Sequence, residues 1–192
     1  PCVTFPVRDR RGRTQFIVRR SIGGKSFYLP KDITKSVYGL YELPNNAKTV
    51  IIAESCFNVL TSYVYGVPAL GLLGTGSGSQ LDVLKTLGVS EFVIGTDNDE
   101  AGDKGANRIR KALSQVAIIR RMYLPDGKDI NDLTKDEFWE IFNAYKNNRE
   151  YILYEIVHLA HSKGYLDEIL ENLKSSEFYR NAFYKIIDES KN

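Results

Sequence analysis

Cysteine is scarce in this sequence, and its scarcity excludes two classes of small domain. Cys2 and Cys56 are the only cysteines among 192 residues, and no Cys-x-x-Cys pair occurs. A disulfide scaffold and a zinc ribbon within these residues are therefore excluded. Because free thiols suit a reducing compartment, we expect a cytoplasmic protein.

Long hydrophobic runs are absent as well. No apolar stretch approaches the roughly 18 residues of a membrane-spanning helix, and the first residues do not have the pattern of a signal peptide. We therefore expect no membrane partner. The chain opens on Pro1 rather than Met, and its first residues already read as a strand, so we expect it to be a piece of a longer protein.

Charge is nearly balanced overall but unevenly distributed. The formal net charge is +2, yet residues 1–48 hold ten Lys and Arg against three Asp and Glu. The rest of the chain is therefore net acidic. A basic N-terminal part suits a polyanion, whereas an acidic remainder can concentrate cations. A merely well-solvated surface is the alternative for the basic part.

Residues 1–47 are expected to form a partial, basic β subdomain. Residues 3–7 and 14–20 alternate apolar and polar around a turn at residues 9–12, which predicts a hairpin. A third strand is predicted at residues 26–29. Glycine, proline and asparagine between residues 38 and 46 indicate a connector to the next domain.

From Thr49 the pattern changes to short, continuous apolar runs, which are typical of parallel strands buried on both faces. These runs lie at residues 49–53, 69–72, 92–95 and 117–119. Helical patterns separate them at residues 55–65, 79–87 and 101–115. This alternation predicts right-handed crossovers and a parallel α/β sheet within residues 48–134. Helical periodicity then resumes, so residues 135–192 are expected to be a C-terminal helical subdomain.

Two aspartates follow the third predicted strand of this sheet. Side chains alternate in an extended segment, so Asp97 and Asp99 can point to the same side. Two carboxylates close together repel unless a cation lies between them. The carboxyl end of a parallel strand is also where open α/β sheets bind ligands. The alternative is structural, with Asp97 capping the next helix and Asp99 solvated in the turn.

A third acid occupies the matching position after the first buried strand. If the two strands are neighbours, Glu54 converges with Asp97 and Asp99 on one crevice and completes a set of oxygen ligands for Mg²⁺ or Mn²⁺. Favourable interaction with a helix dipole is the alternative for Glu54. The acidic loop at residues 126–132 follows the fourth strand and is expected at the same edge, unless it is an ordinary solvated turn.

The order of these motifs resembles the TOPRIM domain. Glu54 follows the first strand, Gly-Thr (residues 74–75) the second, Asp-x-Asp-x-Ala-Gly (97–102) the third, and Leu-Pro-Asp-Gly-x-Asp (124–129) the fourth. More narrowly, three segments resemble bacterial and phage DnaG-type primases. They are Phe-Pro-Val-Arg-Asp-x-x-Gly at residues 5–12, Val-Tyr-Gly-Leu-Tyr at residues 37–41, and Leu-Pro-Asp-Gly-Lys-Asp at residues 124–129. The resemblance runs from about residue 3 to residue 134 and implies a Rossmann-like parallel sheet flanked by helices.

The resemblance also implies roles for the acids. Glu54, Asp97 and Asp99 would be catalytic and would bind Mg²⁺ or Mn²⁺, with Asp129 as a further metal ligand. Two amides stand where this family usually has acids, namely Asn58 and Asn131. Their oxygens could still act in the outer coordination shell but bring no charge, so weaker or Mn²⁺-preferring binding is expected.

Basic residues of the N-terminal part match ones that the family uses to contact template and nucleotide. They are Arg8, Arg20, Lys25 and Lys35. The implied activity is synthesis of RNA primers from ribonucleoside triphosphates on single-stranded DNA, with a replicative helicase as a partner of regions outside this chain. Two alternatives stay open: a TOPRIM nuclease, and a non-catalytic nucleic-acid-binding module of a phage or plasmid replication protein.

Overall fold

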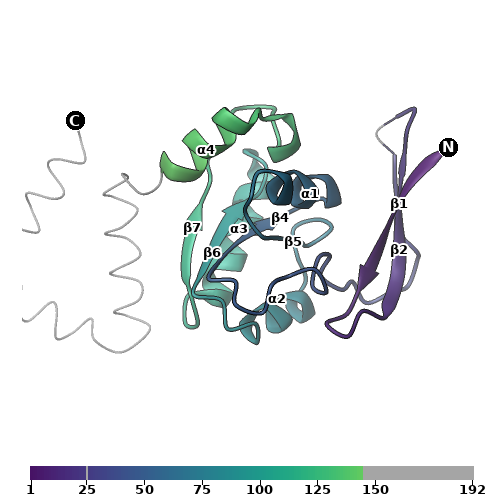
Figure 1. The fold of residues 1–192 in the computed structure, drawn as a ribbon. Helices are drawn as coiled ribbons and strands as arrows, with labels where there is room; N and C mark the ends of the chain where they lie inside the picture. The colour runs from purple at the N-terminus through teal and green to yellow at the C-terminus, as the bar shows by residue number, and fades with distance from the viewer. Residues whose placement is uncertain (25, 145–192) are drawn as a thin grey trace, which may run out of the picture.

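The computed structural model describes residues 1–24 and 26–144, which form two β-sheets with helices around the larger one (Figure 1). Lys25 and the helices predicted beyond residue 144 lie outside the described residues. In the described part of the chain, no helix is long and apolar enough to cross a membrane.

The smaller sheet is the predicted N-terminal hairpin with its third strand. It is antiparallel, in the order β1 (Cys2–Arg8), β2 (Thr14–Ser21) and β3 (Phe27–Tyr28). Alternate apolar side chains of β1 and β2 point to one face and pack against α1 (Cys56–Val64), where Cys56 joins their cluster. The subdomain is therefore held to the rest of the molecule by a shared apolar core, not only by a linker.

The larger sheet is parallel, in the order β5-β4-β6-β7. Its strands are β4 (Thr49–Ala53), β5 (Ala69–Gly71), β6 (Glu91–Gly95) and β7 (Ile118–Arg121). All four lie within about two residues of the predicted runs. The continuous apolar runs predicted these strands well because helices cover both faces of the sheet, so the strands need no polar positions.

Helices cover the two faces of this sheet. On one face lie α2 (Gly78–Lys85) and α3 (Glu100–Leu113), whose apolar residues share a cluster with alternate residues of β4 and β6. On the other face lie α1 and α4 (Lys135–Ala144). The fold is thus a four-stranded parallel α/β sheet with helices on both faces, as the sequence predicted.

The start of the predicted C-terminal subdomain packs directly on this core. Phe138 of α4 is fully buried, and its ring lies 5.2 Å from that of Tyr65 and 5.8 Å from that of Phe142. Tyr65 also donates a hydrogen bond of 2.8 Å to the Leu133 carbonyl. These contacts anchor the chain that leads from the acidic loop into α4.

Candidate metal site at the carboxyl edge of the sheet

Glu54 and Asp97 follow neighbouring strands. β4 and β6 pair directly, with Ala53 opposite Gly95, so the chain leaves both strands at the same edge. The Asp97 N–H donates to Oε1 of Glu54 across 3.3 Å. The structure thus brings together two of the three acids expected at this edge.

The acids of this edge perturb one another electrostatically. Burial raises the pKa of Glu54, and the negative charges of Asp97 and Asp99 raise it further. Burial likewise raises the pKa of Asp97, with added repulsion from Asp129, Asp99 and Asp132. These negative charges repel one another, and a divalent cation bound near them would relieve the repulsion.

One oxygen of Asp97 fits a role as metal ligand. Its Oδ1 is buried and has no hydrogen-bond partner within the described chain. A buried acceptor without a donor costs free energy, which a bound cation would offset. As placed, however, the described residues contain no group of three or more His, Cys, Asp or Glu side chains that could hold a metal ion. Binding would therefore require the carboxylates to turn toward the ion.

Asp99 is fixed by the helix that it precedes. It is the N-cap of α3, and its Oδ1 accepts the Gly102 N–H at 2.7 Å. The alternative in which Asp97 caps this helix is therefore wrong, because the extended backbone of an N-cap occurs at Asp99. Glu54 lies ahead of Ser55, the N-cap of α1, and so is not part of the first turn of that helix.

Asp129 is held in the acidic loop by local hydrogen bonds. It caps a short 3₁₀ turn, η1 (Ile130–Asp132), and its Oδ1 accepts the N–H groups of Asn131 at 2.8 Å and Asp132 at 3.2 Å. Burial raises its pKa, and the neighbouring charge of Asp132 raises it further. Asp129 is thus fixed in orientation and charge-coupled to Asp97.

Asn58 and Asn131, the two amides that stand where this family usually has acids, are in contact. Oδ1 of Asn58, a buried residue of α1, accepts the backbone N–H of Asn131 at 3.2 Å. Oδ1 of Asn131 accepts from the Thr61 hydroxyl at 3.1 Å. Both amides therefore tie the Asp129 loop to α1, whatever role they have toward a metal.

Arg121 is a residue of this edge that sequence reasoning missed. It ends β7, is 8% exposed, and pairs with Asp103 of α3 at 2.6 Å. It also donates to the backbone carbonyl of Asp97 at 3.5 Å and lies over the Tyr123 ring. The sequence did contain a signal for this residue. An arginine at the end of a buried strand needs a partner for its positive charge, which indicates a nearby acid.

The basic residues expected to bind nucleic acid are distributed over different surfaces. Arg8 pairs with Glu42 at 3.4 Å and lies over the Tyr41 ring. Arg20 is half-buried in β2. Lys35 donates to the Leu73 carbonyl at 3.1 Å, beside a loop in which Gly74 N–H donates to the Glu54 carbonyl. Lys35 is thus linked through this loop to the acidic edge, the carboxyl edge of the sheet that carries Glu54, Asp97, Asp99 and Asp129. Lys25 lies outside the described residues.

Comparison with known proteins agrees with this geometry. Residues 51–134 match the family described as Toprim-like. The DNA primase of Haemophilus influenzae is 32% identical over 78% of this chain, and that of Escherichia coli K12 is 31% identical over 74%. The chain spans only 28% and 27% of these curated relatives.

A solved structure gives the same assignment. The DnaG primase catalytic domain bound to single-stranded DNA has a TM-score of 0.61 and 28% identity, over 74% of this chain and 51% of that one. The family match begins within β4 and covers the rest of the four-stranded sheet and both of its acidic loops. Residues 51–134 are therefore a TOPRIM domain of the kind that DnaG-type DNA primases contain.

Proposed function

We propose that this chain is part of the catalytic core of a DNA primase, which joins ribonucleotides into RNA primers on single-stranded DNA during replication. The observation that carries the proposal is the meeting of Glu54 and Asp97 at the carboxyl edge, where a buried Asp97 oxygen has no partner in the described chain. The similarity to DnaG-type primases supports the same conclusion.

A divalent cation, Mg²⁺ or Mn²⁺, is proposed to bind Glu54, Asp97, Asp99 and Asp129. These are oxygen donors, which hard cations prefer. When bound, such ions neutralise charge on the phosphates and align the reacting groups. The protein contributes orientation, because the Gly102 N–H fixes Asp99 and local N–H groups fix Asp129.

The proposed reaction needs no covalent enzyme intermediate. The 3′-hydroxyl oxygen of one ribonucleotide bonds to the α-phosphorus of the next triphosphate, the hydroxyl proton is lost, and pyrophosphate leaves. Such chemistry depends mainly on positioning and charge neutralisation. Arg8, Arg20, Lys25 and Lys35 are proposed to contact the template and the triphosphate, since arginine forks onto phosphate and lysine acts as a point charge.

The wider setting is part of the same proposal. A replicative helicase would bind regions outside this chain, and the cytoplasm would be the place of action. One similar structure supports a role with single-stranded DNA, because the DnaG primase catalytic domain was solved bound to it.

Templated incorporation of ribonucleotides tests the proposal when measured with the full-length protein and its Glu54→Gln variant. Glu140→Gln, an exposed position of α4, is the matched control. Primer synthesis that is lost in Glu54→Gln and kept in the control supports a primase. Cleavage of DNA instead, lost in the same variant, supports a TOPRIM nuclease. Nucleic-acid binding without either reaction supports a non-catalytic module.

A further inference from the structure

Arg121 is the only charged residue among the buried residues of the described part of the chain. It is the last residue of β7, next to the acidic edge, and its side chain is 10% exposed. A buried guanidinium costs free energy unless its charge and its N–H groups have partners. The contacts that Arg121 makes therefore indicate what it does in the fold.

The two terminal nitrogens of Arg121 reach two different elements. Nη1 pairs with Oδ1 of Asp103 in α3 at 2.6 Å, and Nη2 donates to the backbone carbonyl of Asp97 at 3.5 Å. Because a guanidinium is planar and rigid, it fixes the positions of these two partners relative to each other. Arg121 thus links β7 and α3 to the turn that carries Asp97 and Asp99.

Stability alone does not explain this arginine. Apolar side chains of similar volume usually join two elements as well as a buried ion pair does. Ile119 of β7 and Ile109 of α3 already belong to one apolar cluster, so these elements pack together without the ion pair. An apolar residue at position 121 could not donate a hydrogen bond to the Asp97 carbonyl. That donation is therefore the part of the arrangement that requires an arginine.

The backbone of Asp97 is held from both sides. Its N–H donates to Glu54, which follows β4, and its carbonyl accepts from Arg121, which ends β7. β4 and β7 are the two strands that flank β6, the strand that leads into this turn. Asn98 adds a second tie on the β7 side, because its Nδ2 donates to Oδ1 of Asp126 at 2.7 Å. Without the arginine, the turn would lose most of its support from β7.

Asp103 allows a cationic side chain to lie beside a site that must itself attract cations. It balances the charge of Arg121, and Arg121 contacts the backbone of Asp97 and not its carboxylate. Oδ1 of Asp97 keeps no hydrogen-bond partner among the residues that the structure describes. The ion pair can therefore orient Asp97 without occupying the oxygen that is proposed to bind metal.

We propose that Arg121 is a positioning residue of the metal site. It holds the backbone of Asp97 in place, so that the carboxylate has only to rotate about its own side-chain bonds to reach a metal ion. Arg121 acts through Asp97 and is not itself a metal ligand. The inference rests on the proposed function, because the metal ion belongs to that proposal.

Two variants separate positioning from stability. Arg121→Met removes the charge and both contacts but keeps a long side chain. Arg121→Lys keeps a positive charge that can pair with Asp103, but its single nitrogen lacks the rigid fork that reaches Asp97 as well. Arg121→Lys should therefore have nearly the same Tm as the parent. If Arg121 served stability only, lysine would also restore every other property.

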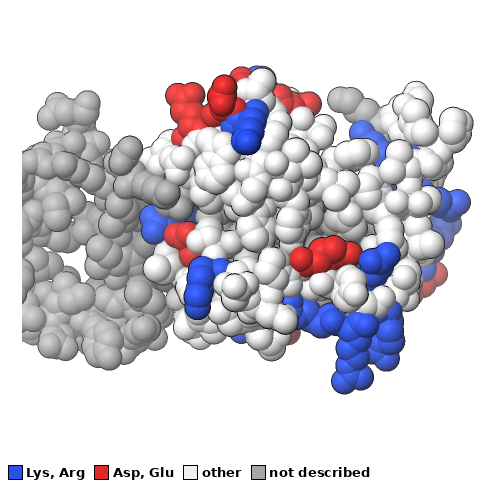
Figure 2. All heavy atoms as spheres, in the orientation of Figure 1, with Lys and Arg blue, Asp and Glu red and all other residues white. Residues whose placement is uncertain are grey.

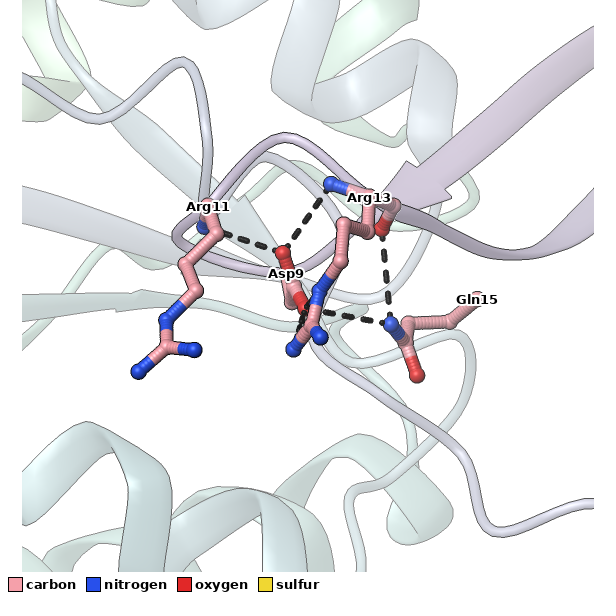
Figure 3. Close-up of polar contacts among 4 residues, drawn as sticks. All are labelled: Asp9, Arg11, Arg13 and Gln15. Carbon is pink, nitrogen blue, oxygen red and sulfur yellow. Dashed lines mark hydrogen bonds and ion pairs between the residues drawn. The ribbon is translucent and has the colours of Figure 1, made fainter.

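The β1–β2 turn supplies a matched control. Oδ2 of Asp9 pairs with the Arg13 guanidinium at 2.8 Å, so this turn also contains a close arginine–aspartate pair (Figure 3). The Arg13 side chain is 68% exposed, and the turn belongs to the smaller, antiparallel sheet. Lys and Arg side chains gather on the surface at this end of the molecule (Figure 2). Arg13→Met thus removes one charge, as Arg121→Met does, without touching the turn of Asp97.

Hydrogen–deuterium exchange of the full chain in EDTA measures the turn without any metal. The reporters are peptides that cover residues 96–103, because the N–H groups of Asp97 and Gly102 donate to Glu54 and Asp99. Both Arg121 variants should exchange about ten-fold faster than the parent in these peptides, as for the loss of one hydrogen bond to a charged group. Peptides from β4 should exchange as in the parent, which excludes global unfolding, and Arg13→Met should match the parent throughout.

Calorimetric titration with Mn²⁺ measures the consequence for the site. Both Arg121 variants should bind Mn²⁺ roughly five-fold more weakly than the parent, because part of the binding free energy is then used to order the turn. Arg13→Met should bind Mn²⁺ as the parent does. Weaker binding by Arg121→Lys at an unchanged Tm is the result that a purely structural role would not produce.

The inference is overturned if Arg121→Lys matches the parent in exchange at residues 96–103, because the fork would then be unnecessary. It is also overturned if exchange becomes faster in the variants while Mn²⁺ affinity stays the same, because the order of the turn would then not matter to the metal. A parent chain that binds no Mn²⁺ contradicts the proposed metal site itself. The exchange rates in EDTA then still decide whether Arg121 holds the turn, so the two failures are distinguishable.

Discussion

Replacing Gly102 with alanine should disrupt the turn that carries Asp97 and Asp99. A Cβ at Gly102 would lie 2.0 Å from the carbonyl oxygen of Asp97 and 3.0 Å from its carbonyl carbon. Both are backbone atoms, so no side-chain rotation can make room. α3 and the loop before it must therefore move apart. This lengthens two hydrogen bonds, from the Gly102 N–H to Asp99 and from the Thr96 hydroxyl to the Gly102 carbonyl.

Gly105, three residues further along the same helix, gives the matched comparison. A Cβ there would meet its nearest neighbour, Thr75, at 3.4 Å, which is ordinary contact. Overpacking costs about 1–3 kcal/mol, and a lost N-cap costs about 1 kcal/mol more. Alanine regains about 0.5–1 kcal/mol over glycine inside a helix. Gly102→Ala should therefore be destabilised by about 2 kcal/mol net, whereas Gly105→Ala should be as stable as the parent or slightly more stable.

Thermal unfolding of the parent and the two variants measures this difference. For a protein of this size, the expected loss lowers the Tm of Gly102→Ala by roughly 4–8 °C. Mn²⁺ titration into the folded proteins gives a second measurement, because only Gly102→Ala displaces the two aspartates. If both alanine variants unfold at the same temperature and titrate alike, the close approach of Gly102 to Asp97 does not limit this turn, and the reasoning fails.

Three further predictions concern other parts of the molecule. Hydrogen bonds, the largest from the Thr134 N–H, lower the pKa of Glu137 from 4.5 to about 2. The stability that Glu137 contributes is thus fully present above pH 4.5 and is lost as the pH falls through about 2. Glu137→Gln should therefore have a lower Tm than the parent at neutral pH and the same Tm in strong acid. A Tm difference that does not change with pH would contradict this. Burial raises the pKa of Cys56 to about 12, so iodoacetamide should modify exposed Cys2 alone until the protein unfolds, and mass spectrometry of the native protein should show a single adduct. Asn58→Asp buries a charge, so we expect this variant to have a lower Tm than the parent. Added Mg²⁺ should raise the Tm of the variant by more than it raises the Tm of the parent. Equal Tm increases with Mg²⁺ would exclude Asn58 from the metal environment.

Most of the fold could be predicted because its signals are local. Continuous apolar runs locate β4 and β6 within a residue, since strands covered on both faces need no polar positions. The alternation around residues 9–12 locates the hairpin in the same way. The convergence of Glu54 with Asp97 required one assumption, that these strands are neighbours, and their pairing satisfies it.

Features that depend on contacts between distant segments could not be predicted. Arg121 meets Asp103 only because α3 lies over the end of β7. Asp99, and not Asp97, is the N-cap, because α3 begins at Glu100 and the N-cap is the residue directly before the first helical one. The pocket between the β1–β2 turn, residues 34–40 and α2 is formed by three segments that are far apart in the sequence and that only the fold brings together.

Asn58 and Asn131 show how the acidic edge accommodates its departures from the family pattern. The two amides lie together between α1 and the loop that carries Asp129, joined by the hydrogen bond from the Asn131 N–H to Asn58 Oδ1. Acids at both positions would place two more negative charges beside Asp129, whose pKa burial already raises. Amides remove that repulsion while keeping an oxygen acceptor at each position. The loop is therefore held by its own hydrogen bonds, and in the proposed metal site the attraction for a cation would come from Glu54, Asp97, Asp99 and Asp129.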